Sequence, residues 1–160
     1  LPCADASVDV QRCERVFQHH GETERAAAEI ARVLRPGGRA VVLDSDWATA
    51  VIHPGDPEVV RVMAATMLRT AANPYSARRI PGQLTAAGLD VADIGSEALL
   101  QPAEAATGPL VQLMARRAHD DGAISAEQHE RLLADLAGAA TRGDFFMTVT
   151  MFAVLARKPS

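Results

Sequence analysis

The sequence predicts an α/β fold built on a β-strand, an α-helix and a second β-strand in direct succession. Apolar residues mark a strand from Val8 to Cys13, and apolar residues then recur at helical spacing over about Glu22–Leu34. The run Ala40–Leu43 is continuously apolar, as in a strand that is buried on both faces. Nearly all such crossovers join parallel strands with a right-handed turn, so a parallel pair with a covering helix is the expected centre of the fold.

The first helix has clear end signals. Glu22 and Glu24 fall in its first turn and Arg32 and Arg35 in its last, as the helix dipole favours. Pro36–Gly38 follows and is expected to end the helix in a tight turn. Proline cannot continue a helix, and glycine accepts the left-handed cap.

Turn and cap signals divide the next part of the chain. Asp56 is suited to cap a helix with Pro57 at its first position. Asn73-Pro74 breaks that helix, and Gly88 ends the one that follows. The predicted elements are a loop over 48–57, helices over 58–71 and 76–87, and a strand over 89–100.

The rest of the chain is predicted to contain two helices and a long strand. One helix covers about Gly108–His119, and Ser125 with Gln128 forms a capping box that opens a second helix to about Ala140. The final apolar stretch, Phe145–Pro159, is expected to be a strand.

Composition restricts the partners that we expect. The 160 residues, 48% of them hydrophobic, fit one domain with a sizeable core. The net charge of −4 and the lack of a basic cluster argue against nucleic acid. No apolar run approaches a membrane span and no signal peptide is seen, so we expect no membrane partner and a cytoplasmic location. Two cysteines without a C-x-x-C motif suggest neither a disulfide framework nor a metal site.

Polar side chains follow both strands of the predicted parallel pair. In open α/β sheets, ligands bind beyond the carboxyl ends of such strands. The two carboxylates Asp44 and Asp46 could serve as acid/base groups or as weak metal ligands, although pairing with arginines such as Arg79 is the more ordinary role. Trp47 either shapes a cavity or packs in a core. The candidates are Cys13, Glu14, Arg15 and His19 after the first strand, and Asp44, Asp46 and Trp47 after the second.

The motifs LPCADASVDV, VFQH and ETERAAAEIARVLRPGGRAVVLDSD lie in one stretch of the chain. Together they resemble the middle of a class I S-adenosylmethionine-dependent methyltransferase, of the small-molecule type that acts in menaquinone, ubiquinone and natural-product synthesis. Val8 departs from the usual aromatic residue, and His20-Gly21-Glu22 stands where Leu/Val-Pro-Asp is common. The resemblance implies a Rossmann-like methyltransferase fold with a partial sheet, strand order 4-5-7-6 with strand 7 antiparallel, and inserted helices.

The resemblance also implies that this chain carries only part of the family fold. The family's glycine-rich turn that grips the cofactor is absent from this sequence, and about 100 residues would precede Leu1 in the family plan. The chain is then either part of a longer protein or a truncated relative. The open edge of the first strand would be covered by an N-terminal segment or by a second copy in a homodimer.

The activity implied is methyl transfer from S-adenosyl-L-methionine to an oxygen or carbon atom of a small organic substrate. The loop Cys13–Val16, with Glu14 and Arg15, would lie beside the methionine part of the donor. His19 would act as general base, and a structural hydrogen-bonding role is the alternative for it. Segments 48–75 and 101–142 would form a helical lid over the substrate. The substrate-binding residues implied are Asp44, Asp46, Trp47, Tyr75 and Arg79.

A non-methylating relative is the alternative hypothesis. Such a protein would have lost the donor-binding half and would act as a binding or regulatory subunit. It could also be an enzyme, for example a cyclase, that uses the remaining cavity.

Overall fold

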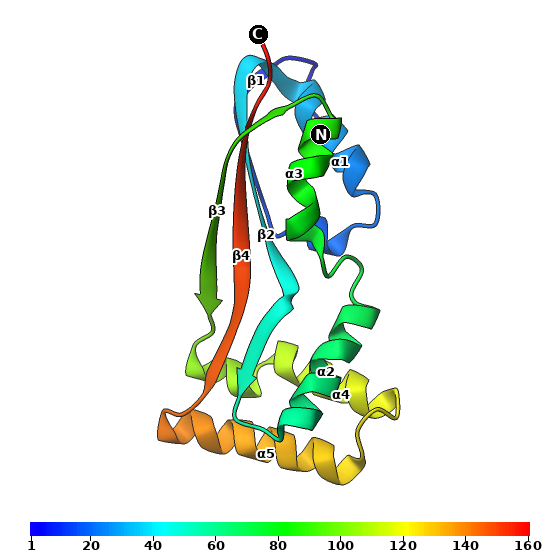
Figure 1. The fold of residues 1–160 in the computed structure, drawn as a ribbon, viewed down its shortest axis with the longest axis vertical. Helices are drawn as coiled ribbons and strands as arrows, with labels where there is room; N and C mark the ends of the chain where they lie inside the picture. The colour runs from blue at the N-terminus through cyan, green and yellow to red at the C-terminus, as the bar shows by residue number, and fades with distance from the viewer. The chain divides into compact units, whose positions relative to one another are not determined.

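The computed structural model describes all 160 residues, which form two compact units (Figure 1). Unit 1 comprises residues 1–46, 72–97 and 151–160, and unit 2 comprises residues 47–71 and 98–150. The strands β2 (Leu34–His53), β3 (Asp90–Leu100) and β4 (Phe146–Arg157) each contribute residues to both units.

The four strands form one sheet in the order β1-β2-β4-β3, with β1 (Val8–Glu14) at an edge. β1 and β2 are parallel, and Glu14 lies opposite Leu43. β4 runs antiparallel to β2, because Lys158 exchanges backbone hydrogen bonds with Gly37 and Gly38 at the start of β2. The observed strand order and the antiparallel last strand are those predicted.

Two helices, α1 (Thr23–Val33) and α3 (Ser76–Ala86), lie on the same face of the sheet in unit 1 (Figure 1). Gly88 closes α3 as predicted. It has a φ of +84°, and its N–H donates to Thr85 while that of Leu89 donates to Leu84, which is the Schellman arrangement. The fully buried core of this unit includes Phe17, Ala27, Leu34, Val42, Ile80, Leu84, Val154 and Ala156.

The sequence predicted that a glycine-capped turn at Pro36–Gly38 would end α1, and the structure differs from this prediction. The backbone is already extended at Leu34, the residue that ends the helix. Arg35 precedes Pro36, and the proline ring disfavours a helical conformation in the residue before it. The helix therefore ends before the glycines are reached.

Pro36–Gly38 instead forms an irregularity within β2. Val8 of β1 pairs with Leu34, but Val10 pairs with Arg39, so extra residues of β2 are accommodated between them. Gly37 has a φ of +77°, and a Cβ on Gly38 would lie 2.8 Å from the carbonyl oxygen of Arg35. The two glycines are thus required by the backbone of the strand.

In unit 2, β2 continues to His53, whereas the sequence predicted a loop from residue 48. The backbone N–H of Thr150 in β4 donates to Oγ1 of Thr49 at 2.8 Å, so the extension of β2 lies beside β4. This partner lies about a hundred residues away in the chain, and local sequence does not indicate it. Trp47 accordingly lies in a strand rather than at the start of a loop.

Three α-helices and a short 3₁₀ helix complete unit 2: α2 (Pro57–Thr70), η2 (Ala103–Thr107), α4 (Pro109–Asp120) and α5 (Ala126–Arg142). Both predicted caps are confirmed. The Asp56 carboxylate accepts from the N–H groups of Glu58 and Val59, and Ser125 and Gln128 form a reciprocal capping box. The core of this unit includes Val59, Met63, Val111, Met114, Leu132, Leu136 and Met147.

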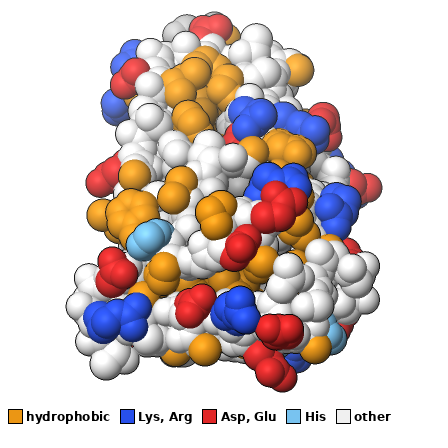
Figure 2. All heavy atoms as spheres, turned by 60° about the horizontal axis from the view of Figure 1, so that its bottom comes forward, with side chains coloured by type: hydrophobic (Ala, Val, Ile, Leu, Met, Phe, Trp, Pro, Cys, Tyr) orange, Lys and Arg blue, Asp and Glu red, His pale blue; other side chains and the backbone are white.

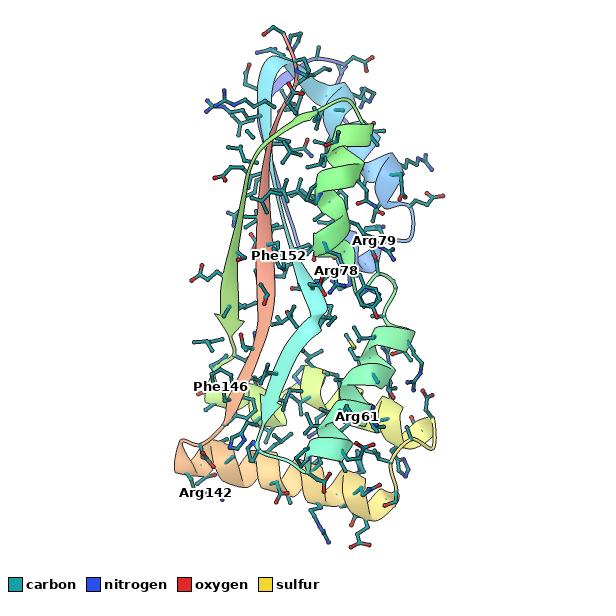
Figure 3. The ribbon with its side chains drawn as sticks, viewed as in Figure 1. Arg61, Arg78, Arg79, Arg142, Phe146 and Phe152 are labelled. Carbon is teal, nitrogen blue, oxygen red and sulfur yellow. The ribbon has the colours of Figure 1, made fainter.

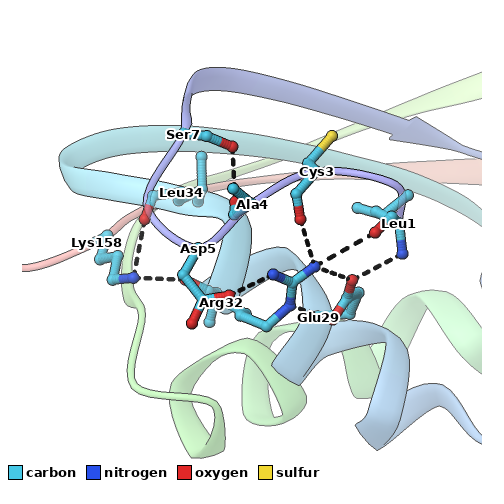
Figure 4. Close-up of polar contacts among 10 residues, drawn as sticks. Leu1, Cys3, Ala4, Asp5, Ser7, Glu29, Arg32, Leu34 and Lys158 are labelled. Carbon is cyan, nitrogen blue, oxygen red and sulfur yellow. Dashed lines mark hydrogen bonds and ion pairs between the residues drawn. The ribbon is translucent and has the colours of Figure 1, made fainter.

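Arg32 of α1 holds the first residues of the chain (Figure 4). Its guanidinium donates to the carbonyl oxygen of Cys3 at 2.9 Å and to the carboxylates of Glu29 and Asp5. Lys158 donates to the carbonyl oxygens of Ala31 and Leu34, and so satisfies acceptors at the end of α1 that have no partner in the helix.

On the face shown in Figure 2, basic side chains mostly lie beside acidic ones, with apolar side chains between them. None of the helices combines the length and the hydropathy that crossing a membrane would require.

Candidate functional site

The candidate site lies in unit 1, where β1 and the first half of β2 end beside the start of α3. Glu14, the last residue of β1, is level with Leu43, so Asp44 directly follows the paired part of β2. The chain leaves β1 through Arg15 and Val16 and enters a single 3₁₀ turn, η1 (Phe17–His19). The end of β1 and the end of the paired part of β2 therefore bring their following residues together, as expected for a parallel pair.

Asp44 is a fully buried carboxyl group. Its two oxygens accept from the backbone N–H groups of Gln18, at 2.9 Å, and Ser45, at 2.8 Å. Burial raises the pKa of Asp44, while these two hydrogen bonds, the Ser76 hydroxyl and the charge of His19 act in the opposite direction. Asp44 thus ties η1 to β2 and can hold a proton more readily than an exposed aspartate.

His19 ends the same 3₁₀ turn, and its side chain is exposed. Its Nε2 atom lies 3.2 Å from Nε2 of Gln18, so the Gln18 amide contacts one ring nitrogen. The imidazole is open to solvent on a turn that is anchored by a buried carboxyl group.

Asn73, which the sequence marks only as a helix break, fixes the turn from the other side. Its side-chain amide donates to the carbonyl oxygen of Phe17 and its backbone N–H to that of Gln18, both at 3.2 Å. Ser76 nearby donates from its hydroxyl to the carbonyl oxygen of Ser45 at 3.3 Å. Sequence reasoning missed Asn73 and Ser76 because their partners are far away in the chain.

Asp46 is buried and accepts two hydrogen bonds from Arg78, one from Nε and one from Nη2, the latter at 2.9 Å. The guanidinium lies over the Tyr75 ring, 5.0 Å from its centroid, in cation–π geometry. These hydrogen bonds raise the pKa of Arg78. The planar fork matches a carboxylate and holds the start of α3 against β2.

The arginine that pairs with Asp46 is thus Arg78 rather than Arg79. Figure 3 shows both residues at the start of α3. Consecutive residues on a helix are turned by about 100°, so Arg79 points elsewhere, and its charge acts on Glu24 of α1.

The other residues predicted for the strand ends have separate surroundings. Cys13 packs against the core of unit 1, and burial followed by the nearby Asp44 charge raises its pKa. Glu14 pairs with Arg12 and lies 3.9 Å from Arg15. Arg15 has a φ of +52°, which is rare for a residue with a side chain, and the side chain of Val16 is exposed.

Trp47 belongs to unit 2 and packs against its apolar core.

Comparison with known proteins finds matches in both sequence and fold. Residues 1–42 match a family model described as a methyltransferase domain. Over 160 residues the chain is 34% identical to an uncharacterized 37.1 kDa protein of a Streptomyces fradiae transposon, covering 98% of this chain and 45% of that protein. The chain therefore spans less than half the length of the curated relative it matches.

Solved structures share the fold at low sequence identity. A Bacillus halodurans protein described as a methyltransferase is 15% identical, with a TM-score of 0.58, over 100% of this chain and 68% of its own. The YcgJ protein of Bacillus subtilis is 19% identical, with a TM-score of 0.57, over the same shares of the two chains. A Galdieria sulphuraria protein described as a sarcosine dimethylglycine methyltransferase is 18% identical, with a TM-score of 0.51, over 99% of this chain and 56% of its own.

The resemblance found in the motifs and the predicted fold class are both confirmed. The chain has an α/β fold that it shares with solved structures described as methyltransferases, and its first 42 residues match a methyltransferase domain.

Proposed function

We propose that the protein takes part in methyl transfer from S-adenosylmethionine to an oxygen or carbon atom of a small organic molecule. The observation that carries the proposal is the exposed His19 near the buried Asp44, where β1 ends beside the middle of β2. His19 itself lies within the segment that matches a methyltransferase domain. The match supports the reaction class, and the geometry supports the residue that would move a proton.

The residues after β1 fit one part of the donor. Glu14, Arg15 and Val16 are exposed at the end of the strand, and the Arg15 N–H is held by the carbonyl oxygen of Leu43 at 2.9 Å. We assign the loop Cys13–Val16 to the methionine part of the donor. When bound, S-adenosylmethionine supplies an electrophilic methyl group on a sulfonium centre. The remaining donor contacts would come from residues outside this chain, which spans 45% of its curated relative.

His19 has the role of general base in this proposal. It would accept the proton that the substrate oxygen or carbon must lose, and the nearby Asp44 charge would stabilise the imidazolium that forms. Asn73 and Gln18 would keep the turn, and with it the ring, in position. Because displacement at a sulfonium disperses charge, alignment and exclusion of water would supply most of the acceleration.

The role of α3 in this proposal is to shape the substrate side of the site. The pair between Arg78 and Asp46 fixes the first turn of α3, and Tyr75 precedes that turn. Tyr75 and Arg79 are the proposed substrate contacts, and the buried Asp44 and Asp46 hold the turn and the helix beside them. A second copy or a segment preceding the chain is proposed to cover the outer edge of β1.

Calorimetric titration with S-adenosylhomocysteine, together with the intact mass of the natural protein, tests the proposal. We expect micromolar binding by a protein larger than the 17.0 kDa of this chain. His19→Ala should leave that binding intact and lower methyl transfer by about 10²–10⁴-fold, while the neighbouring His20→Ala serves as the matched control.

A natural protein of 17.0 kDa that does not bind S-adenosylhomocysteine would contradict the proposal and favour the non-methylating alternative. Equal losses from His19→Ala and His20→Ala would remove His19 as the base and leave the reaction class standing.

A further inference from the structure

An apolar groove in unit 2 lies between the end of β2 and α2. It encloses about 580 Å³, within the range of small-molecule sites. Ala50, Val51 and Ile52 line its strand side, and Val51 is 51% exposed. Ridge residues of α2 at four-residue spacing line its helix side: Val60, Ala64 and Leu68.

Of this ridge of α2, Val60 packs partly buried against the core of unit 2, whereas Ala64 and Leu68 do not. The helix buries a different stripe, Val59, Met63 and Thr66, which lies among the residues buried in the unit. α2 therefore has two apolar faces, one of which is packed in the core and one of which borders the groove. An amphipathic surface helix needs only the first.

The ionisable side chains that line the groove are both basic, His53 and Arg61, and no acidic side chain lines it. Arg61, labelled on α2 in Figure 3, is paired with Glu58 on its own helix, with Nε 2.9 Å from Oε2. Both side chains are about two-thirds exposed, and such exposed pairs add little stability. His53 lies 3.8 Å from Asp144 and is also largely exposed. Either side chain can therefore turn toward an anion in the groove, the guanidinium of Arg61 as a cation and the imidazole of His53 as a hydrogen-bond donor.

We propose that this groove binds a free small amphiphile that has an apolar body and one anionic head. The body would lie along the α2 ridge and the exposed Val51, and a carboxylate or phosphate head would lie at Arg61 and His53. An apolar wall with cations at one part of the lining is complementary to this class of molecule. The proposal does not depend on methyl transfer, because every lining residue belongs to unit 2 and none belongs to the candidate site.

Calorimetry with decanoate and decanol, both kept below aggregation, tests the site on the natural protein. Decanoate should bind more tightly than decanol, and Arg61→Gln should weaken decanoate binding by about tenfold while leaving decanol unaffected. Glu58→Gln should strengthen decanoate binding, because it releases Arg61. Arg131→Gln, which breaks the comparable pair with Glu127 on α5, is the matched control and should change neither affinity.

Two substitutions that fill or polarise the groove show whether the probes bind there or elsewhere on the protein. Ala64→Trp should abolish binding of both probes, and Val60→Asn should weaken both, with circular dichroism showing that each variant remains folded. Equal affinities for decanoate and decanol, or unchanged binding by both variants, would overturn the proposal. So would a dimer that binds no decanoate and separates on Ala64→Trp, since the occupant would then be a second copy of the chain.

Discussion

Two buried carboxylates, Asp44 and Asp46, stand two residues apart in β2 and are stabilised in different ways. Asp44 accepts backbone N–H groups, which ties it to the turn that carries His19. Asp46 accepts the guanidinium of Arg78, which ties it to α3. The charge of Asp46 is neutralised by a guanidinium, which suits a structural role. Asp44 has a pKa raised by burial and lies near His19, so it can influence the proton on that histidine. We therefore assign Asp44 to the chemistry and Asp46 to the architecture.

The reactivity of the Cys13 thiol should depend on the charge of Asp44. Burial, and after it the Asp44 carboxylate, raises the Cys13 pKa, and the thiolate is the reactive form. We expect iodoacetamide to alkylate Cys13 more slowly than the exposed Cys3 at pH 8, as followed by mass spectrometry of peptides. Asp44→Asn should accelerate alkylation of Cys13 and leave Cys3 unchanged. Identical rates at Cys13 in both proteins would mean that burial alone controls this thiol.

Glu29 should make stability depend on pH in the acid range. Its hydrogen bond with Arg32 is the main cause that lowers its pKa from 4.5 to about 2. A lowered carboxyl pKa contributes stability that is present above the unfolded value and is lost as pH falls through the folded value. Urea unfolding should therefore show Glu29→Gln to be clearly less stable than the parent at pH 6. The difference should shrink as the pH approaches 2, and a constant difference at all pH values would contradict the assignment.

At the scale of single elements, signals that act within a few residues could be predicted from the sequence. The cap at Asp56, the capping box at Ser125 and the glycine closure at Gly88 each depend on atoms within one turn, and the structure has all three. The end of β2 was predicted wrongly because its partner, Thr150 in β4, is distant in sequence. The turn at Pro36–Gly38 was predicted wrongly for a similar reason, because pairing with β1 keeps it within a strand.

The candidate site shows the same limit. Its strand-end residues could be predicted because parallel strands place their carboxyl ends together. Asn73 could not, because nothing in a helix break specifies that its amide reaches the carbonyl oxygen of Phe17. The choice between Arg78 and Arg79 depends on the rotation of α3 about its own axis, which sequence spacing leaves open.

Arg78 should stabilise the start of α3, whereas Arg79 should contribute very little to its stability. Arg78→Gln removes two charge-assisted hydrogen bonds and leaves the Asp46 carboxylate, which is 1% exposed, with less compensation. We expect a loss of about 2 kcal/mol in the free energy of unfolding, measured by urea denaturation. Arg79→Gln, the adjacent exposed arginine, should cost less than about 0.5 kcal/mol. Equal losses would show that the pair with Asp46 does not hold the helix.

At the scale of the whole molecule, the predicted strand order is confirmed, whereas the sequence did not predict the division into two units. Hydrophobic periodicity shows which face of a helix is apolar, but it does not show which neighbouring element packs against that face. The segments expected to form a lid, 48–75 and 101–142, fall largely within unit 2, which has its own core around Met63 and Met114. Their action as a lid stays a prediction.

The two cores should be separable by amide hydrogen exchange. Met63 in unit 2 and Leu84 in unit 1 are both fully buried, so Met63→Ala and Leu84→Ala should each cost about 2–5 kcal/mol. Because exchange in a native protein follows local opening, each substitution should speed exchange mainly in its own unit, in α2 and α4 for Met63→Ala and in α1 and α3 for Leu84→Ala. Leu113→Ala, at a position 42% exposed, is the control and should change little. Uniform acceleration along the whole chain in both variants would mean that one cooperative structure, rather than two compact units, opens to solvent.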